Sequence, residues 1–190
     1  MRTFIAIDLP KPFKDYLAGV QAELKATGAD IKWVEPCNIH LTLKFLGETD
    51  DKKTVEVARA LEDVACAEKS FHIRLKSIGA FPNTDFPRVI WVGIDKGDGE
   101  TKMIAGTLEE KILKVGIPKE TRPFSSHITI GRLRSGLNRM KLAQMLDKIK
   151  DNPDRENLEF QAGKITLFKS TLTSKGPIYE ILKEANLKAI

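Results

Sequence analysis

Apolar and polar positions follow two patterns along this chain, and these patterns separate short strands from longer helices. Residues 4–9 and 88–94 are nearly continuous apolar runs, and residues 71–81 alternate between apolar and polar side chains. Runs of this length predict β-strands, and the continuous ones predict buried strands. Apolar residues at three- and four-residue steps predict amphipathic helices over 12–27, 51–67, 100–115 and 138–150.

Further strands are predicted over 39–47, over 127–133 and in the C-terminal region. In that last region, a Thr-Ser-Lys-Gly turn at 173–176 is expected to join two strands. The final segment, 176–187, is also compatible with a helix, so its type stays open.

The elements repeat in the same order. The first half of the chain contains a strand, a helix and a strand that carries His40. The second half contains the same series, which ends in a strand that carries His127. The spacing is nearly equal, with 35 positions from Ile5 to His40 and 37 from Ile90 to His127. Such a repeat predicts two similar lobes that face each other and bring the two histidine strands together across a cleft.

The two histidine strands share a motif, His-x-Thr-x, which reads HLTL at 40–43 and HITI at 127–130. Side chains alternate between the two faces of a strand, so each histidine shares a face with its threonine and the aliphatic pair takes the other face. The aliphatic pairs are expected to pack into the lobes. Two imidazoles and two hydroxyls are then expected to meet in the cleft.

Chance does not readily explain the repeated motif. The chain has 3 histidines and 13 threonines among its 190 residues. Two hits with threonine at the second following position are therefore expected in roughly one such chain in seventy. A single histidine in an apolar strand is more often structural than catalytic, but the pair reverses that preference. His72 has no such threonine and is expected on the surface or on an edge strand.

The shared face offers the groups that phosphoester chemistry without a metal needs. A neutral imidazole can take a proton from a nucleophile while a charged one gives a proton to a leaving oxygen. Hydroxyls can donate hydrogen bonds to phosphate oxygens. Neither motif carries the Asp and Glu cluster that would hold Mg²⁺. Arg132 points off this face in a regular strand, but a bulge at Gly131 would turn it toward developing charge on a phosphate.

Composition narrows the class of protein further. The net charge of +5 suits a phosphate-bearing partner without requiring one. Two cysteines are too few for a disulfide framework, and no apolar stretch approaches a membrane span, so a cytoplasmic protein is expected. The CNIH segment matches no zinc spacing, and GDGETK departs from the phosphate-loop pattern and predicts a turn before a helix.

Taken together, HLTLKFLGE and HITIGR resemble the paired signatures of the two-histidine phosphoesterase superfamily. The opening MRTFIAIDLP and the segment FPRVIWVGI resemble its RNA 2′,3′-cyclic phosphodiesterase branch, also called 2′-5′ RNA ligase. The resemblance covers nearly the whole chain. It implies an α+β fold in a single domain over 1–190, with two pseudo-symmetric lobes, each with an antiparallel-rich sheet and helices, and an active-site cleft between them.

The same resemblance implies a role for each motif residue. His40 would be the proton donor and His127 the proton acceptor when a terminal 2′,3′-cyclic phosphate is hydrolysed to a 2′-phosphate. The reverse reaction could join a 2′-5′ bond. Thr42, Thr129 and Arg132 would bind the phosphate, and no metal or cofactor is expected.

Residues outside the motifs enter through the same resemblance. Phe45, Phe81, Phe86 and Arg88 are candidates for stacking on RNA or steering it, although core packing is favoured for the three phenylalanines. Ser125-Ser126 stands where the family often has Lys-Pro. The expected partner is RNA with 2′,3′-cyclic phosphate ends, tRNA fragments among them, bound by a monomer. Two alternatives stay open: a non-catalytic module that binds RNA ends, and a two-histidine esterase for a small cyclic nucleotide.

Overall fold

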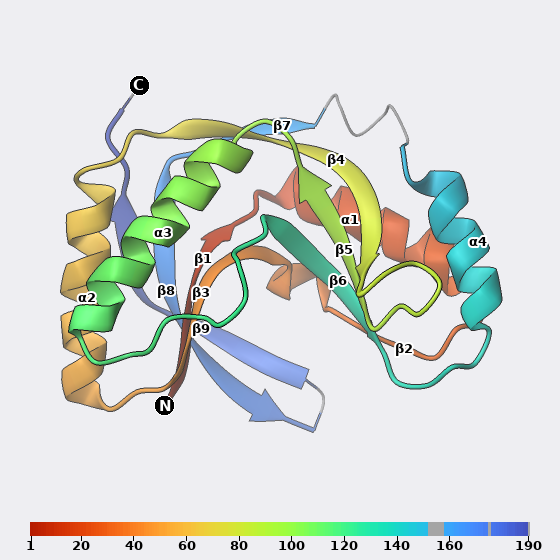
Figure 1. The fold of residues 1–190 in the computed structure, drawn as a ribbon, viewed down its shortest axis with the longest axis horizontal. Coiled ribbons are helices and arrows are strands. Elements are labelled where there is room, and N and C mark those ends of the chain that lie inside the picture. Colours follow the sequence, from red (N-terminus) through yellow and green to blue (C-terminus); the bar gives the residue numbers. More distant parts are fainter. Residues whose placement is uncertain (152–157, 175, 190) are drawn as a thin grey trace.

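The strands join into one strongly curled sheet whose order is symmetric about its centre (Figure 1). The computed structural model describes residues 1–151, 158–174 and 176–189. The sheet order is β7-β4-β5-β6-β3-β1-β8-β9, and β2 pairs with β6. The strands are β1 (Arg2–Asp8), β2 (Ile31–Trp33), β3 (His40–Glu48), β4 (Phe71–Phe81), β5 (Val89–Ile94), β6 (His127–Leu133), β7 (Glu159–Ala162), β8 (Lys164–Thr173) and β9 (Gly176–Asn186).

The two halves of the chain occupy matching places in this sheet. β3 and β6 lie at its centre, β1 and β5 flank them, and β8 and β4 follow on either side. The repeat predicted from the sequence is therefore confirmed as β1–α1–β3 in one half and β5–α3–β6 in the other. The sequence led us to expect that the two histidine strands face each other across a cleft. Instead they pair directly, with Leu41 opposite Ile128.

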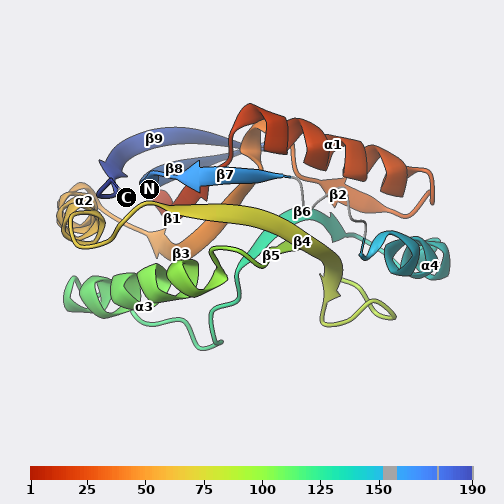
Figure 2. The same ribbon diagram turned by 90° about the horizontal axis from the view of Figure 1, so that it is seen from above.

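The helices cross from one half of the chain to the other. α1 packs beside α4 and against β6, whereas α3 packs beside α2 and against β3 (Figure 1). Seen from above, the strands lie between α1 and α3 (Figure 2). No helix in the described ranges is both long enough and apolar enough to cross a membrane. The helices are α1 (Lys11–Lys25), α2 (Asp51–Ala65), α3 (Asp98–Lys114), α4 (Arg139–Ile149) and the short 3₁₀ helix η1 (Pro36–Asn38).

The predicted amphipathic patterns account for the core. α1 buries Phe13, Leu17, Val20 and Leu24 at helical spacing, as the sequence predicts. The nearly continuous apolar run of β5 lies between β4 and β6, with Ile90, Val92 and Ile94 buried and Val89 and Trp91 partly buried. Burial of these side chains supplies the main driving force for folding.

The C-terminal region forms strands, as predicted. The final segment, for which a helix was an open alternative, is the strand β9, antiparallel to β8 along its whole length. The preceding run departs from the prediction because it is interrupted at Gly163, so β7 pairs with β4 while β8 pairs with β1. Lys175, in the predicted turn, lies outside the described residues.

His72 was expected on the surface or on an edge strand. The residue is half-buried and lies opposite Gln161 of β7, whereas the pairing of β4 with β5 begins only at Leu75. At His72, β4 therefore has a paired strand on one side and is an edge on the other, as expected.

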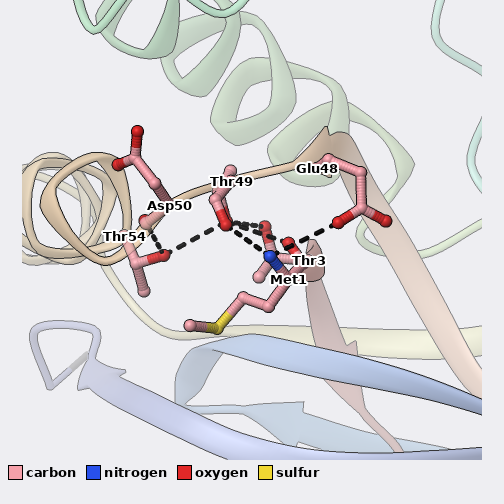
Figure 3. A network of polar contacts seen from close by, with 6 residues as sticks. All are labelled: Met1, Thr3, Glu48, Thr49, Asp50 and Thr54. Atoms are coloured by element: carbon pink, nitrogen blue, oxygen red, sulfur yellow. Dashed lines mark hydrogen bonds and ion pairs between the residues drawn. The ribbon is translucent and has the colours of Figure 1, made fainter.

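A polar network joins the far end of β3 to the first residues of the chain (Figure 3). The Met1 ammonium donates to the carbonyl oxygen of Thr49 (2.6 Å) and pairs with Glu48 (3.3 Å). The Thr49 hydroxyl lies 3.0 Å from that of Thr3 and 3.1 Å from that of Thr54 on α2. These contacts fix the end of β3 opposite His40, together with the start of α2.

Candidate active site

The register between β3 and β6 places the two motifs against each other. Leu41 pairs with Ile128, and both side chains are fully buried. Neighbours on either side of an antiparallel pair also lie opposite each other. His40 is therefore set against Thr129, and Thr42 against His127, on one face of the sheet. Two imidazoles and two hydroxyls are brought together, as the sequence predicts.

The ring of His40 is held at both nitrogens. Nδ1 donates to the carbonyl oxygen of Asn38 (2.7 Å), and Nε2 lies 3.0 Å from the hydroxyl oxygen of Thr42. Because a carbonyl can only accept, Nδ1 carries a proton in either charge state. Nε2 is consequently the atom that gains or loses the second proton.

His127 makes the same Nδ1 contact at the matching place. Its Nδ1 donates to the carbonyl oxygen of Ser125 (2.7 Å), again two residues before the histidine. Both rings therefore keep Nε2 for chemistry, and backbone rather than side-chain groups set the tautomer. The difference from the family's common Lys-Pro at 125–126 leaves this contact intact, since it uses only a carbonyl.

Aromatic rings surround His40. Phe4 stacks on its imidazole at 4.8 Å between centroids, and Tyr179 meets it edge-on at 5.5 Å. Desolvation by this packing lowers the pKa of His40 below its ordinary value, although the Asn38 carbonyl and the charge of Asp8 oppose the shift.

His127 lies in the corresponding place in the second half, against Phe81, whose ring meets it edge-on at 5.1 Å. Phe81 in turn contacts Trp91, and the indole lies close over Gly79. Burial lowers the pKa of His127, and the positive charge of Arg132 lowers it further, against the Ser125 carbonyl.

A bulge in β6 turns Arg132 toward the shared face. Trp91 pairs with Thr129 and Ile90 with Gly131, so Ile130 has no partner on β5. One extra residue on one strand reverses the side-chain alternation beyond it. The bulge expected near Gly131 is thus confirmed. β3 has the same irregularity against β1 between Thr42 and Lys44, which places Phe45 where Arg132 lies in the other half.

A cavity of about 370 Å³ opens over this face. Its lining includes His40, Thr42, Thr129, Arg132, Phe45, Tyr179 and Asn38. A neighbouring cavity of about 720 Å³ shares His40, Asn38 and Tyr179 with it and extends toward Lys14 and Ile181. His127, opposite Thr42 in register, is not among the lining residues. The cavities therefore meet at His40.

Two buried polar groups support the bulged strands from behind. Gln21 of α1 is 2% exposed, and its amide donates to the carbonyl oxygens of Val34 (2.7 Å) and Ile130 (2.8 Å). In the other half, Lys44 of β3 has a fully buried side chain that donates to Glu109 of α3 (2.7 Å). Each crossing helix thus holds the histidine strand of the opposite half beside its bulge.

The remaining predicted RNA contacts lie in different surroundings. Phe45 is 55% exposed at the cavity and Phe86 is 58% exposed under the guanidinium of Arg139, so core packing was the wrong expectation for both. Phe81 is half-buried against His127. Arg88 has an exposed side chain and does not line either cavity.

Several residues at the site were not singled out from the sequence. Phe4 had been assigned to a buried strand, and Tyr179 lay in the segment whose type was open. Asn38 and Ser125 act through backbone carbonyls, which carry no side-chain signal. No group of three or more His, Cys, Asp or Glu residues gathers anywhere in the described ranges.

Comparison with known proteins matches this arrangement. The model of the LigT-like phosphoesterase family matches residues 7–91 and residues 94–179, one match in each half of the chain. The chain is 41% identical to an RNA 2′,3′-cyclic phosphodiesterase of Methanocaldococcus jannaschii, with 97% of this chain and 99% of the relative covered. The chain belongs to the LigT-like phosphoesterase family.

Other members of the LigT-like family agree in sequence and in fold. An RNA 2′,3′-cyclic phosphodiesterase of Aquifex aeolicus is 34% identical over 97% of this chain and 96% of its own. A crystal structure of a Thermus thermophilus protein superposes with a TM-score of 0.80 at 28% identity, covering 100% of this chain and 99% of that one. The superfamily and fold inferred from the motif pair are therefore confirmed.

Proposed function

We propose that this LigT-like protein is an RNA 2′,3′-cyclic phosphodiesterase that hydrolyses a terminal 2′,3′-cyclic phosphate to a 2′-phosphomonoester. The observation that carries the proposal is the paired placement of His40 and His127. Each ring donates Nδ1 to the carbonyl two residues before it, and each keeps Nε2 for proton transfer on the face that also carries two threonines. Such a pair suits acid–base catalysis near neutral pH.

In the proposed reaction, His127 takes a proton from water as the oxygen attacks phosphorus, and His40 gives a proton to the departing 3′ oxygen. The hydroxyls of Thr42 and Thr129 and the guanidinium of Arg132 bind the phosphate oxygens and stabilise the charge that develops on them. The residues themselves supply both proton transfers, so the mechanism uses no metal and no cofactor. With the 5′ hydroxyl of a second RNA in place of water, the same two proton transfers join a 2′-5′ bond as the 3′ oxygen departs.

The charges around the rings support this direction of proton transfer. Arg132 favours the neutral form of His127, which a base needs, whereas Asp8 favours the charged form of His40, which an acid needs. The two motifs are almost identical in sequence, so this asymmetry comes from neighbours that the fold brings in. The charge of Lys14 lowers the pKa of His40 and so acts against Asp8, with which Lys14 forms an ion pair at 2.7 Å.

The proposed partner is RNA with 2′,3′-cyclic phosphate ends, tRNA fragments included. The protein binds it as a monomer, and one two-lobed domain over 1–190 forms the whole site. The free thiols of Cys37 and Cys66 suit a cytoplasmic setting. A non-catalytic RNA-end binder and an esterase for small cyclic nucleotides are not favoured, because the relatives are named as RNA 2′,3′-cyclic phosphodiesterases.

The test is incubation of the protein with an oligoribonucleotide that ends in a 2′,3′-cyclic phosphate, in the presence of EDTA, followed by identification of the product. The proposal predicts turnover and a product phosphate on the 2′ oxygen. A product phosphate on the 3′ oxygen would contradict the assigned leaving group. Tight, salt-sensitive binding without turnover would favour the RNA-end binder.

A further inference from the structure

Two like charges lie side by side at the rim of the 370 Å³ cavity. Lys32 of β2 and Arg132 of β6 are direct partners in the antiparallel register, and both line the cavity. Directly opposed residues have their Cβ atoms about 5 Å apart on the same face of the sheet, and like charges in this position destabilise the pairing. An anion bound between the two side chains in the cavity would offset this repulsion.

A third cation lines the same cavity from the first half of the chain. It is Arg2 of β1, which lies opposite the far end of β3 from His40. Arg2 has Glu48 opposite it in register, but Glu48 pairs with the Met1 ammonium instead. Within the described parts of the chain, none of Arg2, Lys32 and Arg132 forms an ion pair with an acidic side chain. Among the described lining residues, Glu35 is the one acid.

One phosphate does not use all three of these cations. In the proposed reaction, Arg132 lies with Thr42 and Thr129 at the cyclic phosphate. Lys32 lies farther from the cyclic phosphate than Arg132 does, because it is on the neighbouring strand β2. β2 pairs with β6 at Gly131–Leu133, beyond the point where β3 pairs with β6 at Ile128. An ammonium at this distance suits a second phosphate on the same chain. The ammonium of lysine is a point charge on a flexible stem, which fits a backbone phosphate of variable position.

We infer that Lys32 forms a second phosphate site that binds the phosphate on the 5′ side of the terminal nucleotide. This inference rests on the proposed function and deepens it. A terminal nucleotide inside an RNA carries that second phosphate, whereas a free nucleoside 2′,3′-cyclic phosphate does not. The site therefore makes the enzyme prefer RNA ends over small cyclic nucleotides.

A pair of substrates that differ by one group isolates this site. One is a nucleoside 2′,3′-cyclic phosphate with a free 5′ hydroxyl, and the other carries an added 5′ phosphate. The inference predicts that the unaltered protein prefers the 5′-phosphorylated substrate in kcat/KM. Lys32→Ala is expected to lower that preference about five- to tenfold, and Lys32→Glu to lower it further.

A salt titration gives an independent readout. With a short oligoribonucleotide ending in a cyclic phosphate, Lys32→Ala is expected to reduce the slope of log KM against log salt by about 0.7, the value for one phosphate contact on a single strand. Lys52→Ala, which removes an exposed lysine on α2, is the matched control and is expected to change neither the preference nor the slope.

An unchanged 5′-phosphate preference in Lys32→Ala, or an equal fall in Lys52→Ala, would overturn the second site. If the unaltered protein hydrolyses neither substrate, the proposed function fails instead. The two failures are therefore distinguishable.

Discussion

The side-chain amide of Gln21 donates a hydrogen bond of 2.8 Å to the carbonyl oxygen of Ile130, the residue at which β6 bulges. The backbone amide of Val34 donates to the same carbonyl at 3.1 Å. A residue on α1, in the first half of the chain, thus supports the backbone that turns Arg132 toward the cavity in the second half. The bulge depends on this polar support as well as on the small size of Gly131, where a Cβ would meet Ile31 at 2.8 Å.

Replacing Gln21 with leucine removes both donated hydrogen bonds. We expect the free energy of unfolding to fall by about 1–3 kcal/mol, because the partly buried Val34 carbonyl loses a partner. We also expect KM for a cyclic-phosphate RNA to rise about tenfold, because Arg132 is no longer held in place. Gln161→Leu on β7, which breaks a contact with Ser70, is the control and should leave KM unchanged. An unaltered KM in Gln21→Leu would show that the bulge holds without this amide.

The buried pair of Lys44 and Glu109 predicts an order of stability for two variants. Glu109→Leu leaves the fully buried ammonium of Lys44 without its carboxylate and should destabilise the fold by about 3–5 kcal/mol. Lys44→Met with Glu109→Leu removes both charges and should lose less than Glu109→Leu alone. Chemical denaturation compares both with the unaltered protein. A double variant less stable than Glu109→Leu would mean that the pair contributes more than mutual compensation of its charges.

The hydroxyl of Thr42 is expected to matter more than its methyl group. Thr42→Val removes the contact with Nε2 of His40 and a donor to the phosphate, so kcat/KM should fall about 10- to 100-fold. Thr42→Ser keeps the hydroxyl and should retain most of the activity. Equal losses in the two variants, measured on the same cyclic-phosphate substrate, would argue for a packing role.

The lowered histidine pKa values predict where activity lies on the pH scale. Burial lowers the pKa of both His40 and His127, so the bell-shaped profile of kcat/KM should centre below about 6.5, the usual histidine value. The anionic substrate raises both pKa values in the complex, so the profile of kcat should centre at higher pH. A kcat profile centred below that of kcat/KM would contradict this order.

The same lowered pKa values predict the direction in which stability changes with pH. The unfolded chain binds more protons than the folded one just below the usual histidine pKa, so the free energy of unfolding should fall as pH drops through this window. Denaturation of His40→Ala over the same pH range should show a shallower fall. An equal or steeper fall would assign the pH dependence to other groups.

The sequence predicted the internal repeat, the meeting of the two motifs on one face and the bulge that turns Arg132. These features leave local signals: hydrophobic periodicity, the repeated His-x-Thr-x, and a glycine inside a strand. The direct contact between β3 and β6 leaves no such signal, since Leu41 and Ile128 would be buried equally well in two separate sheets.

Long-range contacts explain what the sequence did not reveal. Lys44 looks like a solvent-exposed residue until α3 brings Glu109 to it, and Tyr179 has no visible partner until β9 crosses beside His40. Phe45 faces the cavity because of a bulge that contains no glycine. In each case the decisive neighbour lies tens of positions away along the chain, beyond the reach of periodicity.

The central claim is that His40 and His127 form one acid–base pair, and the kinetics of three alanine variants test it most directly. His40→Ala and His127→Ala should each lower kcat on a cyclic-phosphate RNA by at least about 100-fold without unfolding the protein. His72→Ala, the third histidine and half-buried on β4, should leave kcat unchanged. Turnover near that of the unaltered protein in either His40→Ala or His127→Ala would contradict the account.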